Sequence, residues 1–371
     1  MMMNAPDYPL KREERVLFQL RSLYQRYGYV HYKMGKFEEY DLYARNKDFL
    51  VSDGVITFTD TDGRLMALKP DVTLSIIRNT RDAGDCVQKV YYSENVYRVS
   101  GSTRQFKEIM QTGLECIGGV DLYSLCEVIA LAAESLEVID AENVLALSHM
   151  GVVSALVGAL ELDADLRAQA LRCIGEKNAD GLRALCPGRD IGGALQLITA
   201  HGAPDRVIEA LRPYCGQGLA KAALEELEAV AENLVRQGRR GVRLDFSVVN
   251  DMNYYNGIVF QGYIRGIPSA VLSGGQYDRL MQRMGREDRA VGFAIYMDLL
   301  ERLEGEARPW DVDTLLLYDA GVDADRLMRT VRRLAEGGRS VTAQRAVPEK
   351  LRYRQLLKYT DGGLEILETH D

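Results

Sequence analysis

The sequence predicts an α+β fold, and three observations carry this prediction. Strand-forming segments joined by turn signals fill the first part of the chain, residues 152–239 carry helical periodicity, and strand-like sequence returns at 242–266. Hydrophobic residues make up 47% and charged residues 27% of the chain, which is enough for an ordinary buried core. With 371 residues, we expect more than one folded unit.

An amphipathic helix opens the ordered sequence. Residues 11–27 place Val16, Leu20 and Leu23 on one face and charged residues on the other, and Gly28 is suited to end the helix.

Two strand pairs follow this helix. Residues 55–69 hold two apolar runs separated by Asp62 and Gly63, a pair that predicts a hairpin. A second pair is expected at 88–99 and 107–118.

A helix is then expected at 121–138, with Asp121 as its N-cap. After the helical module and the strand-like residues 242–266, the glycine-rich segment 273–280 suggests a turn and 292–303 a further helix.

The tail follows a linker at Pro309. Its apolar runs predict a βαβαβ order, in which residues 348–360 form the second helix.

Composition argues against several functional classes. The six cysteines never form a CxxC pair and the four histidines show no HxxxH spacing, so we expect neither a disulfide framework nor a metal. The net charge is −8 and no long Lys/Arg run occurs, which argues against a long polyanion as partner. No apolar run could span a membrane and the first residues lack the apolar core of a secretory signal, so the prediction is a cytoplasmic protein.

Residues 68–73 read LKPDVT and are the first candidate for chemistry. A carboxylate at Asp71 and a hydroxyl at Thr73 suit an ammonium group, because both can accept from its donors. The alternative is structural, with Asp71 capping the helix that follows.

Residues 111–118 read QTGLECIG on an expected strand. Gln111 and Glu115 are four residues apart, so their side chains point to the same face. An edge strand with solvated polar residues is the alternative, but the apolar neighbours favour a pocket.

The third candidate is the string NYYNGIVF at residues 253–260. Tyr254 and Tyr255 next to a glycine can form flat aromatic walls around a ring while a hydroxyl bonds one of its nitrogens. Paired tyrosines alone are more often core residues, so the whole string carries the prediction.

Together, these strings resemble the histidyl-tRNA synthetase family of class II aminoacyl-tRNA synthetases over residues 10–305, and more weakly in the tail. The resemblance implies a mostly antiparallel sheet flanked by helices, a helical insertion and a small C-terminal α/β domain. The implied core has two parts, residues 1–151 and 241–308, with the helical insertion between them at 152–240. Residues 309–371 form a tail that resembles a truncated anticodon-binding domain.

The resemblance also implies a histidine site, completed by Arg98 before the SGSTRQ loop and by Tyr277 in the GGQYD string. The implied histidine-binding residues are Asp71, Thr73, Arg98, Gln111, Glu115, Tyr254, Tyr255 and Tyr277. No cofactor and no catalytic residue are implied.

The chain departs from the family where adenylate chemistry occurs. Asn250 and Asp251 stand in place of an Arg–Gly pair, Leu299 in place of an ATP-binding Arg, Tyr296 in place of a Gly, and Ser100 in place of an acid. Adenylate formation depends on fixed cations that stabilise the charge on the phosphates. We therefore predict that the chain keeps an amino-acid pocket and is not an enzyme.

These features resemble the regulatory subunits of ATP phosphoribosyltransferase, which act in the first step of histidine biosynthesis. The resemblance implies L-histidine as feedback ligand, a short-form catalytic subunit as partner, and a hetero-octamer containing a homodimer formed through the N-terminal helix and strand. Neither tRNA nor a membrane is an expected partner. The alternatives are a histidyl-tRNA synthetase or synthetase-like ligase that activates histidine with ATP, and an unrelated interaction module.

Overall fold

The computed structural model describes residues 11–47, 54–81, 84–100, 103–248, 254–300, 309–336, 338–360 and 363–370. The chain divides into two compact units, residues 1–303 and 304–371. Each unit is described by itself.

The first unit is organised around a sheet that has nine strands in the described residues, in the order β1-β5-β6-β12-β11-β10-β7-β9-β8. Neighbouring strands are antiparallel except for β1 with β5 and β7 with β9. Their bounds are β1 (Val30–His31), β5 (Val87–Val99), β6 (Phe106–Gly118), β7 (Asn143–His149), β8 (His201–Gly202), β9 (Val242–Asp245), β10 (Ile258–Ile264), β11 (Leu272–Gln276) and β12 (Arg289–Tyr296).

A small antiparallel sheet has the order β2-β4-β3, with bounds β2 (Phe37–Glu39), β3 (Thr57–Thr59) and β4 (Leu65–Leu68). The α-helices in the described residues of the unit are α1 (Arg12–Arg26), α2 (Tyr40–Ala44), α3 (Thr73–Asn79), α4 (Leu122–Ile139), α5 (Met150–Gly158), α6 (Ala164–Gly175), α7 (Ala179–Leu185), α8 (Gly192–Thr199), α9 (Pro204–Leu211), α10 (Gly218–Arg236), α11 (Asp278–Arg283) and α12 (Met297–Leu300).

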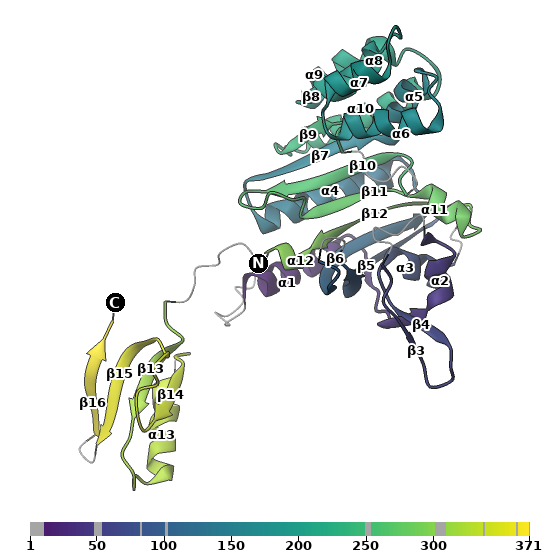
Figure 1. The fold of residues 1–371 in the computed structure, drawn as a ribbon. Helices are drawn as coiled ribbons and strands as arrows, with labels where there is room; N and C mark the ends of the chain where they lie inside the picture. Colours follow the sequence, from purple (N-terminus) through teal and green to yellow (C-terminus); the bar gives the residue numbers. More distant parts are fainter. Residues whose placement is uncertain are drawn as a thin grey trace. The chain divides into compact units, whose positions relative to one another are not determined.

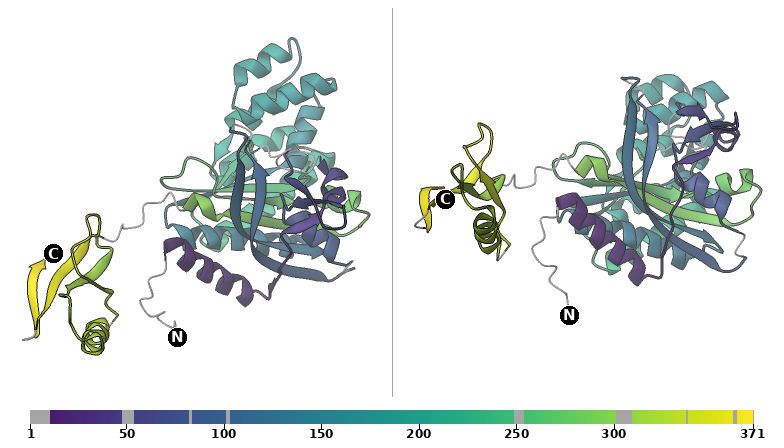
Figure 2. Two further views of the ribbon diagram at one scale, coloured as in Figure 1. Left: turned by 60° about the horizontal axis from the view of Figure 1, so that its bottom comes forward. Right: turned by 90° about the horizontal axis from the view of Figure 1, so that it is seen from below.

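Helices α5 to α10 gather at the end of the large sheet where β7, β8 and β9 lie, whereas α2, α3 and the β3–β4 hairpin lie at the other end (Figures 1 and 2). None of the helices in the described part of the chain combines the length and apolar composition that a membrane span needs.

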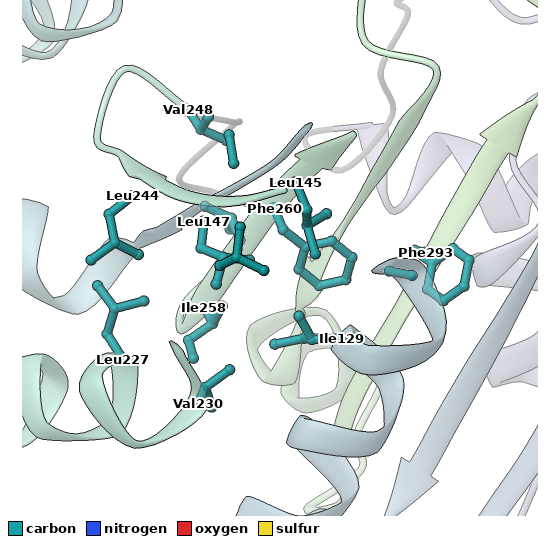
Figure 3. Packing of buried hydrophobic residues seen from close by; sticks show 14 of the residues in the cluster. Ile129, Leu145, Leu147, Leu227, Val230, Leu244, Val248, Ile258, Phe260 and Phe293 are labelled. Atoms are coloured by element: carbon teal, nitrogen blue, oxygen red, sulfur yellow. The ribbon is translucent and has the colours of Figure 1, made fainter. Parts of the chain in front are cut away.

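One face of the large sheet is closed by α4 and α10. Ile129 of α4 and Leu227 of α10 pack against buried side chains of the sheet, among them Leu147, Ile258 and Phe260 (Figure 3). Burying each of these side chains contributes about 1.5–3 kcal/mol. The residues that alternate with them along β6, β10 and β12 face the other way and are available for a site.

The second unit has one four-stranded sheet in its described residues, in the order β14-β13-β15-β16, with β13 parallel to both neighbours. Its elements are β13 (Val312–Leu317), α13 (Ala324–Ala335), β14 (Val341–Gln344), β15 (Tyr353–Thr360) and β16 (Gly363–Thr369). Asp323 caps α13 by accepting from the backbone N–H of Arg326 at 2.9 Å.

Several predicted elements are confirmed. The first helix and both strand pairs form, and Gly63 adopts a φ of 82° in the hairpin turn. Asp121 caps α4 and accepts from the backbone N–H of Ser124 at 2.8 Å.

The glycine-rich turn predicted at 273–280 is wrong, because its first half is strand β11. Large rings lie where side chains at these glycines would be: a Cβ on Gly274 would lie 2.6 Å from the ring of Phe260, and one on Gly275 2.6 Å from the ring of Tyr255. The glycines are needed for close packing above and below a buried strand.

The helix predicted at 292–303 is wrong in its first half, since residues up to Tyr296 belong to β12 and helix begins only at Met297. This strand has partners on both sides, β6 and β11, so sheet pairing overrides the apolar run.

The second helix predicted in the tail, at 348–360, is also wrong. Residues 353–360 form β15, which pairs with β13 and β16 and buries Leu356 and Leu357. A short apolar run does not distinguish strand from helix by spacing alone, and here the tertiary pairing decides.

Candidate functional site

A cavity of about 380 Å³ lies against the face of the large sheet opposite α4 and α10. Every residue predicted for the site lines it: Asp71, Thr73, Arg98, Gln111, Glu115, Tyr254, Tyr255 and Tyr277. The structure therefore brings together side chains that are far apart in the sequence.

Register explains why the sheet residues meet there. Gln111 and Glu115 of β6 lie opposite Tyr296 and Gly292 of β12, and alternation along both strands turns these residues to one face. Both β6 side chains line the cavity, as the spacing of four residues predicted.

Sequence reasoning missed further lining residues, among them Tyr92 of β5, Gln261 of β10 and Ser273 of β11. Gln261 pairs with Ser273 across β10 and β11. Only the strand register, which no local pattern reveals, places them beside the predicted residues.

Glu115 is the most enclosed acid of the cavity, with an exposed fraction of 2%. Its carboxylate accepts from Thr73 Oγ1 at 2.9 Å and from the Tyr277 hydroxyl at 2.6 Å. Burial raises the pKa of Glu115 to about 8, although both hydrogen bonds oppose the shift. A cationic ligand group would find here a carboxyl group that is already oriented, and its charge would favour the ionised form.

Asp71 has two roles at once. Its Oδ1 accepts from the backbone N–H of Leu74 at 2.9 Å, which caps the first turn of α3, and its side chain also lines the cavity. Burial raises its pKa, while the Leu74 N–H and the nearby Arg98 guanidinium counteract the rise. The capping and the binding interpretations are therefore compatible.

Arg98 brings positive charge to the cavity wall from β5. Its Nε donates to the carbonyl of Pro70 at 2.9 Å, which fixes the guanidinium beside the turn that carries Asp71. A guanidinium held in this way can receive a carboxylate.

Three tyrosines form an aromatic wall. The ring centroids of Tyr254 and Tyr255 are 4.6 Å apart, and those of Tyr254 and Tyr277 are 5.9 Å apart. Burial raises the pKa of all three hydroxyls, so they remain protonated and can act as hydrogen-bond donors.

The cavity thus combines two acids, one guanidinium, amide and hydroxyl groups, and an aromatic wall. This set matches a small zwitterion with a flat polar side chain. In the described part of the chain, no group of three or more His, Cys, Asp or Glu side chains is arranged to hold a metal ion.

The structure locates three of the residues that the sequence predicts to be departures from the synthetase pattern. Tyr296 lines the cavity from β12, and Leu299 of α12 packs against the hydrophobic core. Ser100 directly follows strand β5, and its backbone N–H donates to the carbonyl of Gln105 at 2.8 Å. Asn250 and Asp251 lie outside the described residues.

Comparison with known proteins adds the family to this geometry. The family model described as histidyl-tRNA synthetase matches residues 7–300. An ATP phosphoribosyltransferase regulatory subunit from Oceanobacillus iheyensis is 28% identical, over 92% of this chain and 87% of its own length. A protein of the same description from Clostridium kluyveri is 30% identical, over 79% of this chain and 78% of its own length.

A solved structure from Bacillus halodurans, described as an ATP phosphoribosyltransferase regulatory subunit/histidyl-tRNA synthetase, has a TM-score of 0.72 at 25% identity and covers 93% of both chains. This similarity confirms the predicted synthetase-like α+β fold. By fold and by sequence, the chain belongs to the histidyl-tRNA synthetase family and, within it, to the ATP phosphoribosyltransferase regulatory subunits.

Proposed function

We propose that the chain regulates ATP phosphoribosyltransferase by binding L-histidine in the cavity, without catalysing a reaction itself. The observation that carries the proposal is the composition of the cavity, which contains the groups suited to binding an amino acid. It also contains the phenol ring of Tyr296, at the position where the family has a Gly. Feedback control needs a site that recognises the product, whereas adenylate formation also needs cations for ATP phosphates.

The geometry suggests how histidine would be held. Asp71 and the oxygen of Thr73 would accept from the ammonium group, and Arg98 would receive the carboxylate. Glu115 would accept from the imidazole between the tyrosine rings, because Tyr277 and Thr73 already orient its two oxygens. Gln111 supplies a further amide on the same strand face.

Loss of catalysis is the second part of the proposal. Leu299 carries no charge and packs against the core, so this position cannot stabilise a phosphate. Tyr296 adds a ring to the cavity wall beside Arg98. Both changes weaken an ATP site and leave the amino-acid groups in place.

The partner would be a short-form catalytic subunit of ATP phosphoribosyltransferase, in a hetero-octamer that contains a homodimer of this chain. Phe18 of α1 and Val30 of β1 expose 55% and 67% of their surface, and such apolar groups on the N-terminal helix and edge strand suit a dimer contact. The division into 1–151, 152–240, 241–308 and 309–371 and the absence of a tRNA partner stay predictions.

Calorimetric titration with L-histidine and, separately, with ATP tests this proposal. We expect histidine to bind and ATP not to bind, and we expect histidinol, which lacks the carboxylate, to bind more weakly than histidine because it cannot engage Arg98. Reconstitution with a short catalytic subunit should then give activity that histidine inhibits. Tight ATP binding together with ATP–pyrophosphate exchange would instead favour histidine activation by a synthetase-like enzyme.

A further inference from the structure

A chain of polar contacts links the helical segment α10 to the loop that carries Tyr254 and Tyr255. It begins at His149, the last residue of β7. The ring Nδ1 of His149 lies 3.0 Å from the backbone N–H of Gly151 and accepts from it. A neutral ring therefore carries its proton on Nε2, which lies 2.9 Å from Glu226 Oε2 of α10 and donates to it.

Glu226 connects this histidine to the first residue of β12. Its Oε1 lies 3.9 Å from Arg289 Nη2, while its Oε2 accepts from His149. The hydrogen bond from His149 lowers the pKa of Glu226, with the Arg289 charge acting in the same direction and burial acting against both. The carboxylate is thus the charged centre of a three-residue contact.

Arg289 continues the chain of contacts toward the cavity. Its Nη1 donates to the carbonyl of Val120 at 2.9 Å, and its Nε donates to Asp278 Oδ2 at 3.4 Å. The same Oδ2 accepts from Asn256 Nδ2 at 3.2 Å, and Oδ1 accepts from the backbone N–H of Ala290 at 2.9 Å.

Asn256 follows Tyr255 directly, and Asp278 follows Tyr277 directly. The backbone N–H of Asn256 donates to the carbonyl of Gln276 at 3.1 Å, and the Met150 N–H beside His149 donates to the carbonyl of Gly257 at 2.9 Å. The segments that carry Tyr254, Tyr255 and Tyr277 are therefore connected through Asn256 and Asp278 to Arg289. Arg289 in turn contacts Glu226, which accepts from His149.

We infer that Glu226 is a positioning residue: through His149 and Arg289 it fixes the loop around Asn256, and so the helical segment α10 sets how well the tyrosine wall binds its ligand. The statement about ligand affinity rests on the proposed histidine site. The statement about the loop rests on the contacts alone.

Amide hydrogen exchange of the full chain tests the loop. In Glu226→Ala, we expect the Asn256 and Ile258 amides to exchange about 3- to 30-fold faster than in the unchanged protein, because the loop loses its support. Glu225→Ala is the matched control, since Glu225 lies on the same helix, carries the same charge and pairs only loosely with Lys221 at 3.7 Å on the surface. Amides of β5 and β6 report any global loss of stability.

Glu226→Gln is the rescue variant. Its amide oxygen can still accept from His149 Nε2. We therefore expect the loop amides to exchange at a rate between the rates in the unchanged protein and in Glu226→Ala. Equal exchange at Asn256 in Glu226→Ala and Glu225→Ala would overturn the inference.

Histidine titration of the same variants separates the two proposals. We expect Glu226→Ala to weaken histidine binding about 3- to 30-fold, and a double-mutant cycle with Asn256→Ala to show that the two effects are not additive. Additive effects would overturn the coupling to the ligand site. If the unchanged protein binds no histidine while loop exchange still responds to Glu226→Ala, the positioning role stands and the histidine proposal fails.

Discussion

Glu115 of β6 lies over Gly292 of β12, and its carboxylate occupies the space that any side chain at position 292 would need. The two residues are opposite each other in the antiparallel register. A Cβ on Gly292 would lie 2.6 Å from the carboxyl carbon of Glu115 and closer still to its Oε2. The hydrogen bonds from Thr73 and Tyr277 hold the carboxylate in this position.

Gly292→Ala should therefore displace Glu115. We expect histidine binding to fall by at least about 10-fold, and the free energy of unfolding by about 1–3 kcal/mol, because a well-packed site resists an added methyl group. Calorimetry and denaturant unfolding measure the two effects. Gly175→Ala is the matched control, since its Cβ would meet no atom within 4 Å at the end of α6. Normal histidine binding by Gly292→Ala would show that the position of Glu115 is not critical.

Glu115 also makes the stability of the ligand-free protein depend on pH. Burial raises its pKa from 4.5 to about 8, so in this range the folded protein binds a proton that the unfolded chain has released. The free energy of unfolding should thus fall as pH rises from about 4.5 to about 8, by on the order of 1–3 kcal/mol.

Denaturant unfolding at several pH values, with and without Glu115→Gln, measures this dependence. We expect a flatter profile for the variant, because it has no carboxyl group to titrate. Histidine should flatten the profile of the unchanged protein, since a bound cation stabilises the charged carboxylate. Parallel profiles for the two proteins would mean that Glu115 titrates alike in the folded and unfolded states.

Much of this site could be predicted from sequence, because each predicted residue lies in a short string that resembles a string of the histidyl-tRNA synthetase family. The capping role of Asp71 and the shared face of Gln111 and Glu115 needed only local geometry. The contribution of Gly292 could not be predicted, since it depends on which strand lies beside β6.

The same limit explains the errors in the fold. Strands β11 and β12 pack on both faces, so their apolar and glycine-rich sequences lack the alternation that marks a half-exposed strand. Strand β15 buries the adjacent residues Leu356 and Leu357, which also breaks the alternation. In each case, non-local pairing decided between helix, turn and strand.

The Tyr277 hydroxyl orients Glu115, so Tyr277→Phe should act on binding through that carboxylate. We expect the pKa of Glu115 to rise further, because a hydrogen bond that lowers it is lost. Histidine binding should weaken about 10-fold and the free energy of unfolding should drop by about 1–2 kcal/mol. Calorimetry over a pH series and denaturant unfolding provide the measurements.

Tyr123→Phe removes a similar bond, since the Tyr123 hydroxyl donates to Glu127 at 2.9 Å, but this tyrosine is 68% exposed. We expect this control to change stability by less than about 0.5 kcal/mol and to leave histidine binding unchanged. If both variants bound histidine like the unchanged protein, Tyr277 would be only a core residue.

Asp71 offers a test that separates folding from binding. Asp71→Asn keeps an oxygen that can accept from the Leu74 N–H, so the first turn of α3 stays capped, but the negative charge beside the ligand is lost. Asp71→Ala loses both. We expect both variants to weaken histidine binding at least about 10-fold. The free energy of unfolding of Asp71→Ala should be about 1 kcal/mol lower than that of Asp71→Asn, because only the alanine variant loses the helix cap. Should Asp71→Asn bind histidine normally while Asp71→Ala does not, the carboxylate would act only as a helix cap, and the ammonium contact would have to come from another group in the cavity.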